Sequence, residues 1–271
     1  MTGPLLRTRR PAVAGRFYPR DATALAAAVD RLLDAVDVPE TEPPAAAYVV
    51  PHAGYAFSGP TAAHAYARLR RHAGRVRRVV LIGPSHFVRL AGCAAPLSRV
   101  WTTPLGDLPV DEPTGLVTDD APHAFEHSLE VQLPFLQRAL GRPVPILPVA
   151  VGDAAPARVA GHLAAAAATP GTVVLCSTDL SHYLDHAAAA ARDARTAAAI
   201  TALDPDRISP RDACGVYALR GLLAWAGRTG LRAHPLDLRT SAETAGEPAR
   251  VVGYGAFALY AGRVPGQRAP G

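Results

Sequence analysis

Short runs of Val, Ile and Leu alternate along the chain with longer segments of helical pattern, and this alternation restricts the fold more than any other feature. Strands that alternate with helices are typical of a mostly parallel or mixed sheet with helices on both faces. The sequence predicts strands at Ala47–Val50, Val79–Ile82, Pro145–Val151, Val173–Ser177, His234–Arg239 and Val251–Tyr260. It predicts helices at Ala22–Val36, Thr61–Arg71, Ser128–Leu140, Pro156–Ala167, Ala187–Leu203 and Pro210–Ala226. The fold class is therefore expected to be α/β.

Two segments do not fit a plain alternation of strands and helices. The run Val251–Tyr260 is punctuated by small residues, so it is expected either to join the parallel strands or to form an antiparallel edge strand. The segment Trp101–Val110 has proline and glycine at its centre and predicts a hairpin on the surface. Because no internal repeat and no long linker interrupts the chain, one domain is expected over residues 1–271, with flexible tails at 1–10 and 264–271.

Charge and cysteine usage argue against several classes of protein. The formal net charge of +5 is carried by arginine, since the chain contains no lysine. The densest basic stretch, residues 68–78, has no interleaved Phe, Tyr or Trp to stack on bases, so we interpret it as a solvated face and expect no nucleic-acid partner. Cys93, Cys176 and Cys214 show no C-x-x-C spacing, which disfavours a disulfide framework or a zinc finger and fits a reducing compartment.

Targeting signals and membrane segments are not expected either. The arginines at positions 7, 9 and 10 are not followed by an apolar run, so the pattern is not that of a secretory or twin-arginine signal. No apolar window reaches the roughly 18 to 20 residues that a membrane-spanning helix needs. The sequence therefore predicts a cytoplasmic protein with no membrane partner.

Four of the ten histidines lie in loops after predicted strands or beside acidic residues. They are His52 in VVPHAGY, His86 in GPSHF, His127 in FEHSLE and His182 in STDLSHY. The carboxyl ends of strands in open α/β sheets line one crevice, so side chains just beyond them converge although they are far apart in sequence. One such histidine is more often a turn or cap residue, but three delivered by separate strands predict a functional site.

Polar residues beside these histidines favour the same interpretation. Asp179 precedes His182 by three residues, near enough to orient its imidazole or to accept its proton, unless it only caps the following helix. Glu126 and His127 are either helix-capping residues or groups that support the site and contact its substrate. Tyr55 is expected either to contact a substrate through its hydroxyl or to pack against its loop.

Taken together and in order, these motifs resemble the Memo family, called AmmeMemoRadiSam system protein B in bacteria and archaea. The shared segments run from AGRFYP through PHAGY, GPSH, EHSLEVQLPFL, STDLSH and DACG to VVGYGAFALY, which covers nearly the whole chain. Each segment is weak evidence alone, but the ordered set is specific. The resemblance implies a fold like that of the class III extradiol dioxygenases, which bind non-haem iron through two histidines and a carboxylate.

The resemblance also implies roles for particular residues. It assigns the metal ligands to His52, His86 and Cys214 and the acid/base role to His182. A thiolate then stands where the dioxygenases have a carboxylate, which gives a softer ligand set that can hold Fe(II), Cu or Zn. Fe(II) is the first choice because of the resemblance to the dioxygenases. Cys214 is expected early in its helix, where the helix dipole would lower the pKa of the thiol. Cys176 is interpreted as a small core residue.

Three hypotheses for function remain open. The first is a metal-dependent redox enzyme, oxygenase-like, that acts on an unidentified organic or peptide substrate, with His182 and Asp179 moving a proton. The alternative is a non-catalytic signalling or scaffold protein that binds a metal or a peptide in the same pocket. The third is an enzyme with Cys214 as its nucleophile. The family's name also implies AMMECR1-type and radical SAM proteins as partners.

Overall fold

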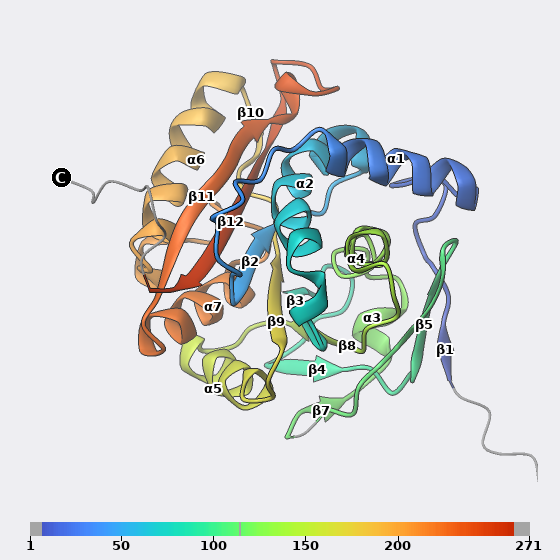
Figure 1. The fold of residues 1–271 in the computed structure, drawn as a ribbon. Coiled ribbons are helices and arrows are strands. Elements are labelled where there is room, and N and C mark those ends of the chain that lie inside the picture. Colours follow the sequence, from blue (N-terminus) through green and yellow to red (C-terminus); the bar gives the residue numbers. More distant parts are fainter. Residues whose placement is uncertain (1–6, 114, 263–271) are drawn as a thin grey trace, which may run out of the picture.

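The computed structural model describes residues 7–113 and 115–262, and this part of the chain is built on a mixed sheet of nine strands (Figure 1). Four neighbouring strands of the sheet are parallel: β2 (Ala47–Val50), β9 (Thr172–Ser177), β3 (Arg78–Pro84) and β8 (Ile146–Val151). All four match predicted strands. Their buried runs of Val, Ile and Leu are typical of strands that are covered on both faces.

Antiparallel strands extend the sheet on both sides of this parallel group. β12 (Val251–Ala261) runs antiparallel to β2 and also pairs with β11 (Leu231–Thr240) and β10 (His182–Leu184). Of the alternatives for the last strand, the antiparallel direction is confirmed, but its expected place at the edge is wrong because β10 and β11 pair with it as well. At the other end, β4 (Cys93–Ala95) runs antiparallel to β8 and pairs with β7 (Val117–Thr118).

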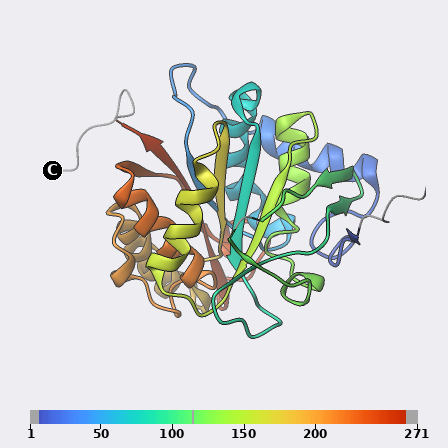
Figure 2. The same ribbon diagram turned by 90° about the horizontal axis from the view of Figure 1, so that it is seen from below.

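Helices cover both faces of the sheet, as predicted (Figure 2). One face carries α1 (Ala22–Asp34), α2 (Tyr55–Arg71) and α4 (Gln132–Leu140), and the other carries α5 (Pro156–Ala167), α6 (His186–Thr201) and α7 (Val216–Arg228). Neighbouring side chains of β2 show this division, since Tyr48 lies in one core and Val49 in the other. The α/β fold class is therefore confirmed.

Helix α7 begins later than predicted, which changes the setting of Cys214. The sequence predicts a start at Pro210, but the helix begins at Val216. The carboxylate of Asp212 accepts hydrogen bonds from the backbone N–H and the hydroxyl of Ser209, at 2.8 and 2.6 Å, and so closes a turn before the helix. Cys214 therefore lies in a loop and not within a helix.

The other helix starts differ by a few residues. α2 begins at Tyr55 rather than Thr61, because Pro60 removes only one helical hydrogen-bond donor and does not end the helix. α4 begins at Gln132 rather than Ser128, so its start lies nearer to the proline within it.

The hairpin predicted over Trp101–Val110 is confirmed. β5 (Val100–Thr103) and β6 (Gly106–Pro109) pair antiparallel, and β1 (Thr8–Arg9) adds to β5. Arg9 is buried and forms an ion pair with Glu130 at 2.8 Å, so residues 8 and 9 do not belong to the tail predicted at 1–10. The tail predicted at 264–271 lies outside the described residues.

Short helical segments complete the described part of the chain. They are α3 (Ala121–Ala124) and the 3₁₀ turns Ala73–Arg75, Pro205–Arg207 and Ser241–Glu243. Within the ranges 7–113 and 115–262, every helix is too short or too polar to cross a membrane.

Candidate metal centre

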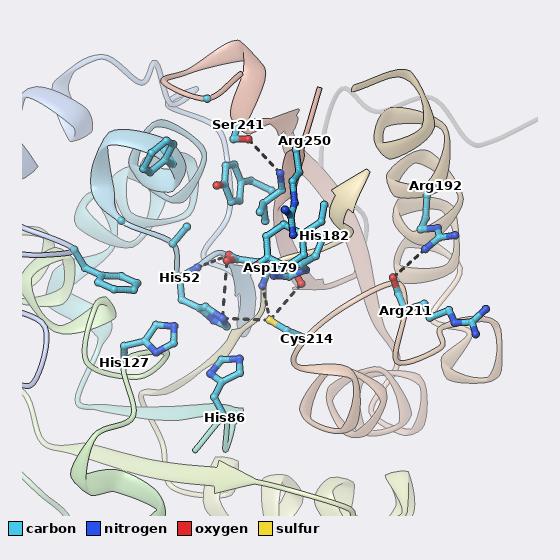
Figure 3. A pocket seen from close by; sticks show the side chains of 18 of the residues that line it. His52, His86, His127, Asp179, His182, Arg192, Arg211, Cys214, Ser241 and Arg250 are labelled. Atoms are coloured by element: carbon cyan, nitrogen blue, oxygen red, sulfur yellow. Dashed lines mark hydrogen bonds and ion pairs between the residues drawn. The ribbon is translucent and has the colours of Figure 1, made fainter. Parts of the chain in front are cut away.

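Loops meet at the carboxyl ends of the central parallel strands, as predicted. β9 lies between β2 and β3, so the loops that follow these three strands are neighbours. They carry His52 after β2, His86 after β3 and Asp179 after β9 (Figure 3). His182, predicted in the last of these loops, is instead the first residue of strand β10. The loop before α7 brings Cys214 to the same point. The structure therefore gathers residues that are more than 100 positions apart in the sequence.

His52 has a fixed tautomer because of the hydroxyl group of Ser177. Nδ1 of His52 lies 2.8 Å from Ser177 Oγ, and that hydroxyl donates its only proton to the backbone carbonyl of Ser128, 2.7 Å away. Ser177 Oγ must then accept from His52, so Nδ1 carries the ring proton and Nε2 keeps a free lone pair. Burial lowers the pKa of His52, as do the neighbouring His86 and His127, so the ring is neutral at pH 7.

His86 is held in the same way by Glu126. Oε1 of Glu126 accepts from Nδ1 of His86 at 2.9 Å, and Oε2 accepts from the backbone N–H of His86 at 2.7 Å. Burial opposes ionisation of this carboxyl, but the hydrogen bonds from His86 and Ser128 outweigh it and lower the pKa of Glu126 to about 2. An ionised carboxylate only accepts, so Nδ1 of His86 carries a proton, and in the neutral ring Nε2 is the lone-pair nitrogen. This contact matches the supporting role expected for Glu126.

His127 stands beside these two rings but is held less firmly. One ring nitrogen each of His52, His86 and His127 lie within 4.8 Å of one another, so the three could hold a metal ion. The His127 ring stacks on the His86 ring, with centroids 4.9 Å apart. Its Nδ1 is 3.6 Å from Glu126 Oε1, which is too long for a hydrogen bond. His127 therefore lacks the fixed tautomer of the other two histidines.

Cys214 contacts the free nitrogen of His52. Its Sγ lies 3.2 Å from His52 Nε2 and accepts a hydrogen bond from the backbone N–H of Asp179 at 3.3 Å. The predicted lowering of the thiol pKa is wrong, because burial and the nearby charge of Asp179 raise the pKa of Cys214 to about 12. Without a metal the pair is therefore a neutral S–H donating to an imidazole. A metal ion that replaced the thiol proton would offset this penalty.

Asp179 contacts His52 rather than His182. Its Oδ1 accepts from the backbone N–H of His52 at 2.7 Å, and its Oδ2 lies 4.0 Å from Nε2 of the same ring. Burial raises the pKa of this carboxyl, although the hydrogen bond from His52 acts in the opposite direction. His182 instead donates from Nδ1 to the carbonyl of Leu180 at 2.8 Å, which leaves its Nε2 free. Asp185, not Asp179, caps the following helix.

Tyr55 packs into the core. Its hydroxyl donates to the carbonyl of Val131 at 2.6 Å, and its ring lies 4.8 Å from that of Phe135. The whole residue is only 7% exposed. Of the two roles expected from the sequence, the structure supports packing, because a hydroxyl already bonded within the core is not available to a ligand.

A cavity of about 940 Å³ opens over this cluster. Its lining includes all the predicted catalytic and metal-ligating residues: His52, His86, Asp179, His182 and Cys214. His127 also lines it. The site is thus a cavity open to solvent with a buried cluster of N, O and S donors beneath it.

Sequence reasoning missed two buried residues that orient the site, Ser177 and Gln132. Gln132 donates from Nε2 to Ser177 Oγ at 3.0 Å, and its Oε1 accepts from the hydroxyl of Tyr66 at 2.7 Å. A signal was present, because Ser177 ends a strand of apolar residues and Gln132 lies on an apolar helix face. Buried polar side chains of this kind almost always have partners.

Comparisons with known proteins agree with the motifs. A family model described as Memo-like protein matches residues 9–258. A MEMO1 family protein from Methanopyrus kandleri is 36% identical over 282 aligned residues, covering 94% of this chain and 99% of the relative. The chain belongs to the Memo-like family. MEMO1 family proteins from Methanococcoides burtonii and Desulfurococcus amylolyticus are 34% and 32% identical, covering 92% and 94% of this chain and 98% and 100% of the relatives.

The donors of this Memo-like chain fit a divalent metal ion. Metal-ligating histidines almost always donate their other ring N–H to a protein acceptor, as His52 does to Ser177 and His86 does to Glu126. Imidazole and thiolate ligands suit Fe, Cu and Zn, whereas Mg and Ca prefer oxygen donors. The arrangement can therefore hold a transition metal at the base of an open cavity.

Proposed function

We propose that this protein binds one redox-active divalent metal through His52, His86 and Cys214 and acts as a non-haem oxygenase-like enzyme on an organic or peptide substrate. The observation that carries the metal site is that Nδ1 of His52 and Nδ1 of His86 each donate to a protein acceptor, which leaves Nε2 of both rings for a metal. Cys214 is preferred to His127 as the third ligand, because its Sγ lies 3.2 Å from His52 Nε2, whereas Nδ1 of His127 lies 3.6 Å from Glu126 Oε1, too far for a hydrogen bond that would fix the ring.

Fe(II) is the first choice of metal and Cu is the redox-active alternative, whereas Zn would fit the same ligands without redox chemistry. The choice of iron rests on the likeness of the motifs to those of the extradiol dioxygenases. When bound, Fe(II) would supply the electrons for chemistry with dioxygen. The sulfur ligand makes the site softer than a site of two histidines and a carboxylate, and softer ligands also suit copper.

His182 is the residue we assign to proton transfer. Its Nδ1–H is held by the carbonyl of Leu180, so Nε2 is left as a proton acceptor on a side chain that lines the cavity. Asp179 has a positioning role, because its carboxylate binds the backbone of His52 and so fixes the loop that carries this ligand.

A second candidate function is binding without turnover, as a metal- or peptide-binding signalling or scaffold protein. The observation that favours it is the exposure of the cavity rim, where the Phe87 and Tyr183 side chains are 63% and 64% exposed. A bound peptide would cover such apolar surface. A role for Cys214 as a nucleophile has less support, since burial raises the pKa of the thiol and lowers that of His52, and both effects oppose a thiolate–imidazolium pair.

The test of the metal site is elemental analysis of protein purified without oxygen, followed by metal titration of variants. His52→Ala, His86→Ala and Cys214→Ala should each weaken metal binding by more than the roughly 10- to 100-fold typical of changes outside the ligand set. His127→Ala should stay within about tenfold of the parent. Circular dichroism controls for folding.

Two outcomes would revise this ligand set. Loss of metal in His127→Ala with retention in Cys214→Ala would replace it with the three histidines. Stoichiometric metal in His52→Ala, His86→Ala and Cys214→Ala would contradict the site altogether.

The role of His182 has a separate test. His182→Ala should keep metal affinity within about tenfold of the parent and lower turnover about 10²- to 10⁴-fold, the usual contribution of a proton-transfer residue. Turnover is measured with the first substrate that the metal-loaded parent consumes. Loss of metal together with activity would make His182 a ligand, and unchanged activity would end its assignment as the base.

A further inference from the structure

The cavity over the metal centre has two chemically different walls. Beside His127, the rings of Phe17 and Phe87 lie with their centroids 4.8 and 5.9 Å from the His127 ring. The lining also contains three arginines, Arg192, Arg211 and Arg250. Figure 3 shows Arg192 and Arg211 on the far side of Cys214 from His127. A ligand in this cavity therefore meets aromatic rings at one end and guanidinium groups at the other.

Arg250 is the arginine best placed to bind an anion. Its guanidinium lies 4.5 Å from the centroid of the Tyr183 ring, a contact that holds the group without neutralising its charge. Within residues 7–113 and 115–262, Arg250 and Arg211 form no ion pair with a carboxylate. Arg192 is 3.9 Å from a carboxylate oxygen of Asp212. Most of the positive charge on this wall is thus unpaired.

The backbone of Tyr183, whose ring contacts Arg250, has an unusual conformation. Tyr183 has a φ of +61°, in the left-handed region that an aromatic residue rarely adopts. The pairing of β10 with β12 ties this segment to the residues that follow Arg250, with Leu184 opposite Val251. Strained residues of this kind cluster at ligand-binding sites, where the surrounding structure holds them in place. Here the ring of the strained residue contacts the guanidinium of Arg250.

The charges of the lining favour an anionic ligand. Among the described residues that line the cavity, Asp179 supplies the one carboxylate, and it is buried and bound to the backbone of His52. A divalent metal at the histidines would add further positive charge. Guanidinium groups bind carboxylate and phosphate oxygens in pairs of parallel hydrogen bonds.

We propose that Arg250, together with Arg192 and Arg211 of the same cavity lining, binds the oxyanion of an organic substrate, a carboxylate or a phosphate group, whose apolar part lies against Phe17 and Phe87. This inference rests on the proposed function, since it names the substrate class of the same cavity. The aromatic wall buries the apolar part of the ligand, and the basic wall selects its charge.

The experiment titrates benzoate, phenyl phosphate and neutral benzyl alcohol onto the full chain freed of metal with a chelator, by isothermal titration calorimetry. At least one of the two anions should bind about tenfold or more tightly than benzyl alcohol. Comparison of the two anions distinguishes a carboxylate site from a phosphate site. Arg250→Gln should weaken binding of the preferred anion about tenfold or more.

Arg195→Gln is the matched control. Arg195 is exposed on the same helix as Arg192, three residues further along, and is not part of the cavity lining. This variant should bind the anion as the parent does. Arg211→Gln is the second variant and should also weaken binding, which keeps the test decisive if Arg250→Gln does not fold.

Three results would overturn the inference: neither anion binds the parent, benzyl alcohol binds as tightly as the anions, or folded Arg250→Gln and Arg211→Gln both bind like the parent. Anions are titrated without metal, and metals are titrated without anions. Failure of the anion subsite is therefore distinguishable from failure of the metal site.

Discussion

A hydroxyl and a carboxylate decide which ring nitrogens are free at this site. The oxygen of Ser177 accepts a hydrogen bond from Nδ1–H of His52, and the carboxylate of Glu126 accepts one from Nδ1–H of His86. Each imidazole then presents Nε2 as a lone-pair donor, which is the form a metal requires. Two residues that are not metal ligands themselves therefore decide which nitrogen of each histidine can bind a metal.

Replacement of Ser177 tests this control. Ser177→Ala removes the acceptor for His52 Nδ1–H and should weaken metal affinity roughly 10- to 100-fold. Ser177→Thr keeps a hydroxyl and should recover most of the affinity. Gln132 retains other acceptors in the carbonyls of Pro51 and Ser128, so the core should stay folded.

The control for Ser177→Ala is Ser58→Ala. Ser58 is also buried, and its hydroxyl donates to the carbonyl of Ala53 beside His52 rather than to the ring. Metal titration of Ser58→Ala should match the parent. Parent-like affinity in Ser177→Ala would show that the hydroxyl does not orient His52.

At the scale of elements, the N-terminal strand fastens the loop that carries Glu126 and His127. Arg9 in β1 donates to the carbonyl of Glu126 at 2.6 Å and pairs with the carboxylate of Glu130. Glu130 also accepts from the hydroxyl of Tyr18 at 2.7 Å. Strand β1 has only two residues and is far from the site in sequence, but it helps to position the loop that carries Glu126 and His127.

Helices α5 and α7 pack closely where Gly221 faces Val159. A Cβ on Gly221 of α7 would lie 2.3 Å from Val159 of α5, so Gly221→Ala should destabilise the protein by about 1 to 3 kcal/mol. Gly227 lies on the same helix with open space around it, so Gly227→Ala should stabilise by roughly 0.4 to 1 kcal/mol.

Urea unfolding of both glycine variants measures these changes. The pair controls for helix propensity, because both substitutions replace glycine by alanine within α7. Equal stability of the two variants would mean that α5 and α7 can move apart without cost.

For the whole molecule, buried neutral histidines predict sensitivity to acid. Burial lowers the pKa of His123 from 6.5 to about 4. The unfolded chain protonates this group below about pH 6.5 and the folded chain only below about pH 4, so the unfolded state binds more protons between these values. Stability should therefore fall as the pH falls from 6.5 to 4, by about 3 kcal/mol for His123 alone.

Urea unfolding of the metal-free protein at several pH values measures this loss. His52 contributes in the same direction, since burial also lowers its pKa. His123→Gln should flatten the dependence between pH 6.5 and 4. A free energy of unfolding that stays constant or rises over this range in the parent would contradict the prediction.

The central strands could be predicted from the sequence alone. β2, β3, β8 and β9 end within two residues of the expected bounds, because strands covered on both faces need continuous apolar runs. β1, β4, β7 and β10 were not predicted. Segments of two or three residues carry no periodicity, and their partners lie elsewhere in the chain.

The residue types of the site were also determined by the sequence, since His52, His86 and Asp179 follow strand ends that parallel order must bring together. Only the tertiary structure decided the tautomers of the histidines and the pKa of the thiol. The free nitrogen of His52 depends on Ser177, 125 residues away. The pKa of Cys214 follows burial and not a helix dipole, because a dipole contributes about 0.3 to 1 kcal/mol while desolvation of a buried charge costs more. Local patterns specify which groups are present, but contact with distant partners and loss of water are properties of the packed fold.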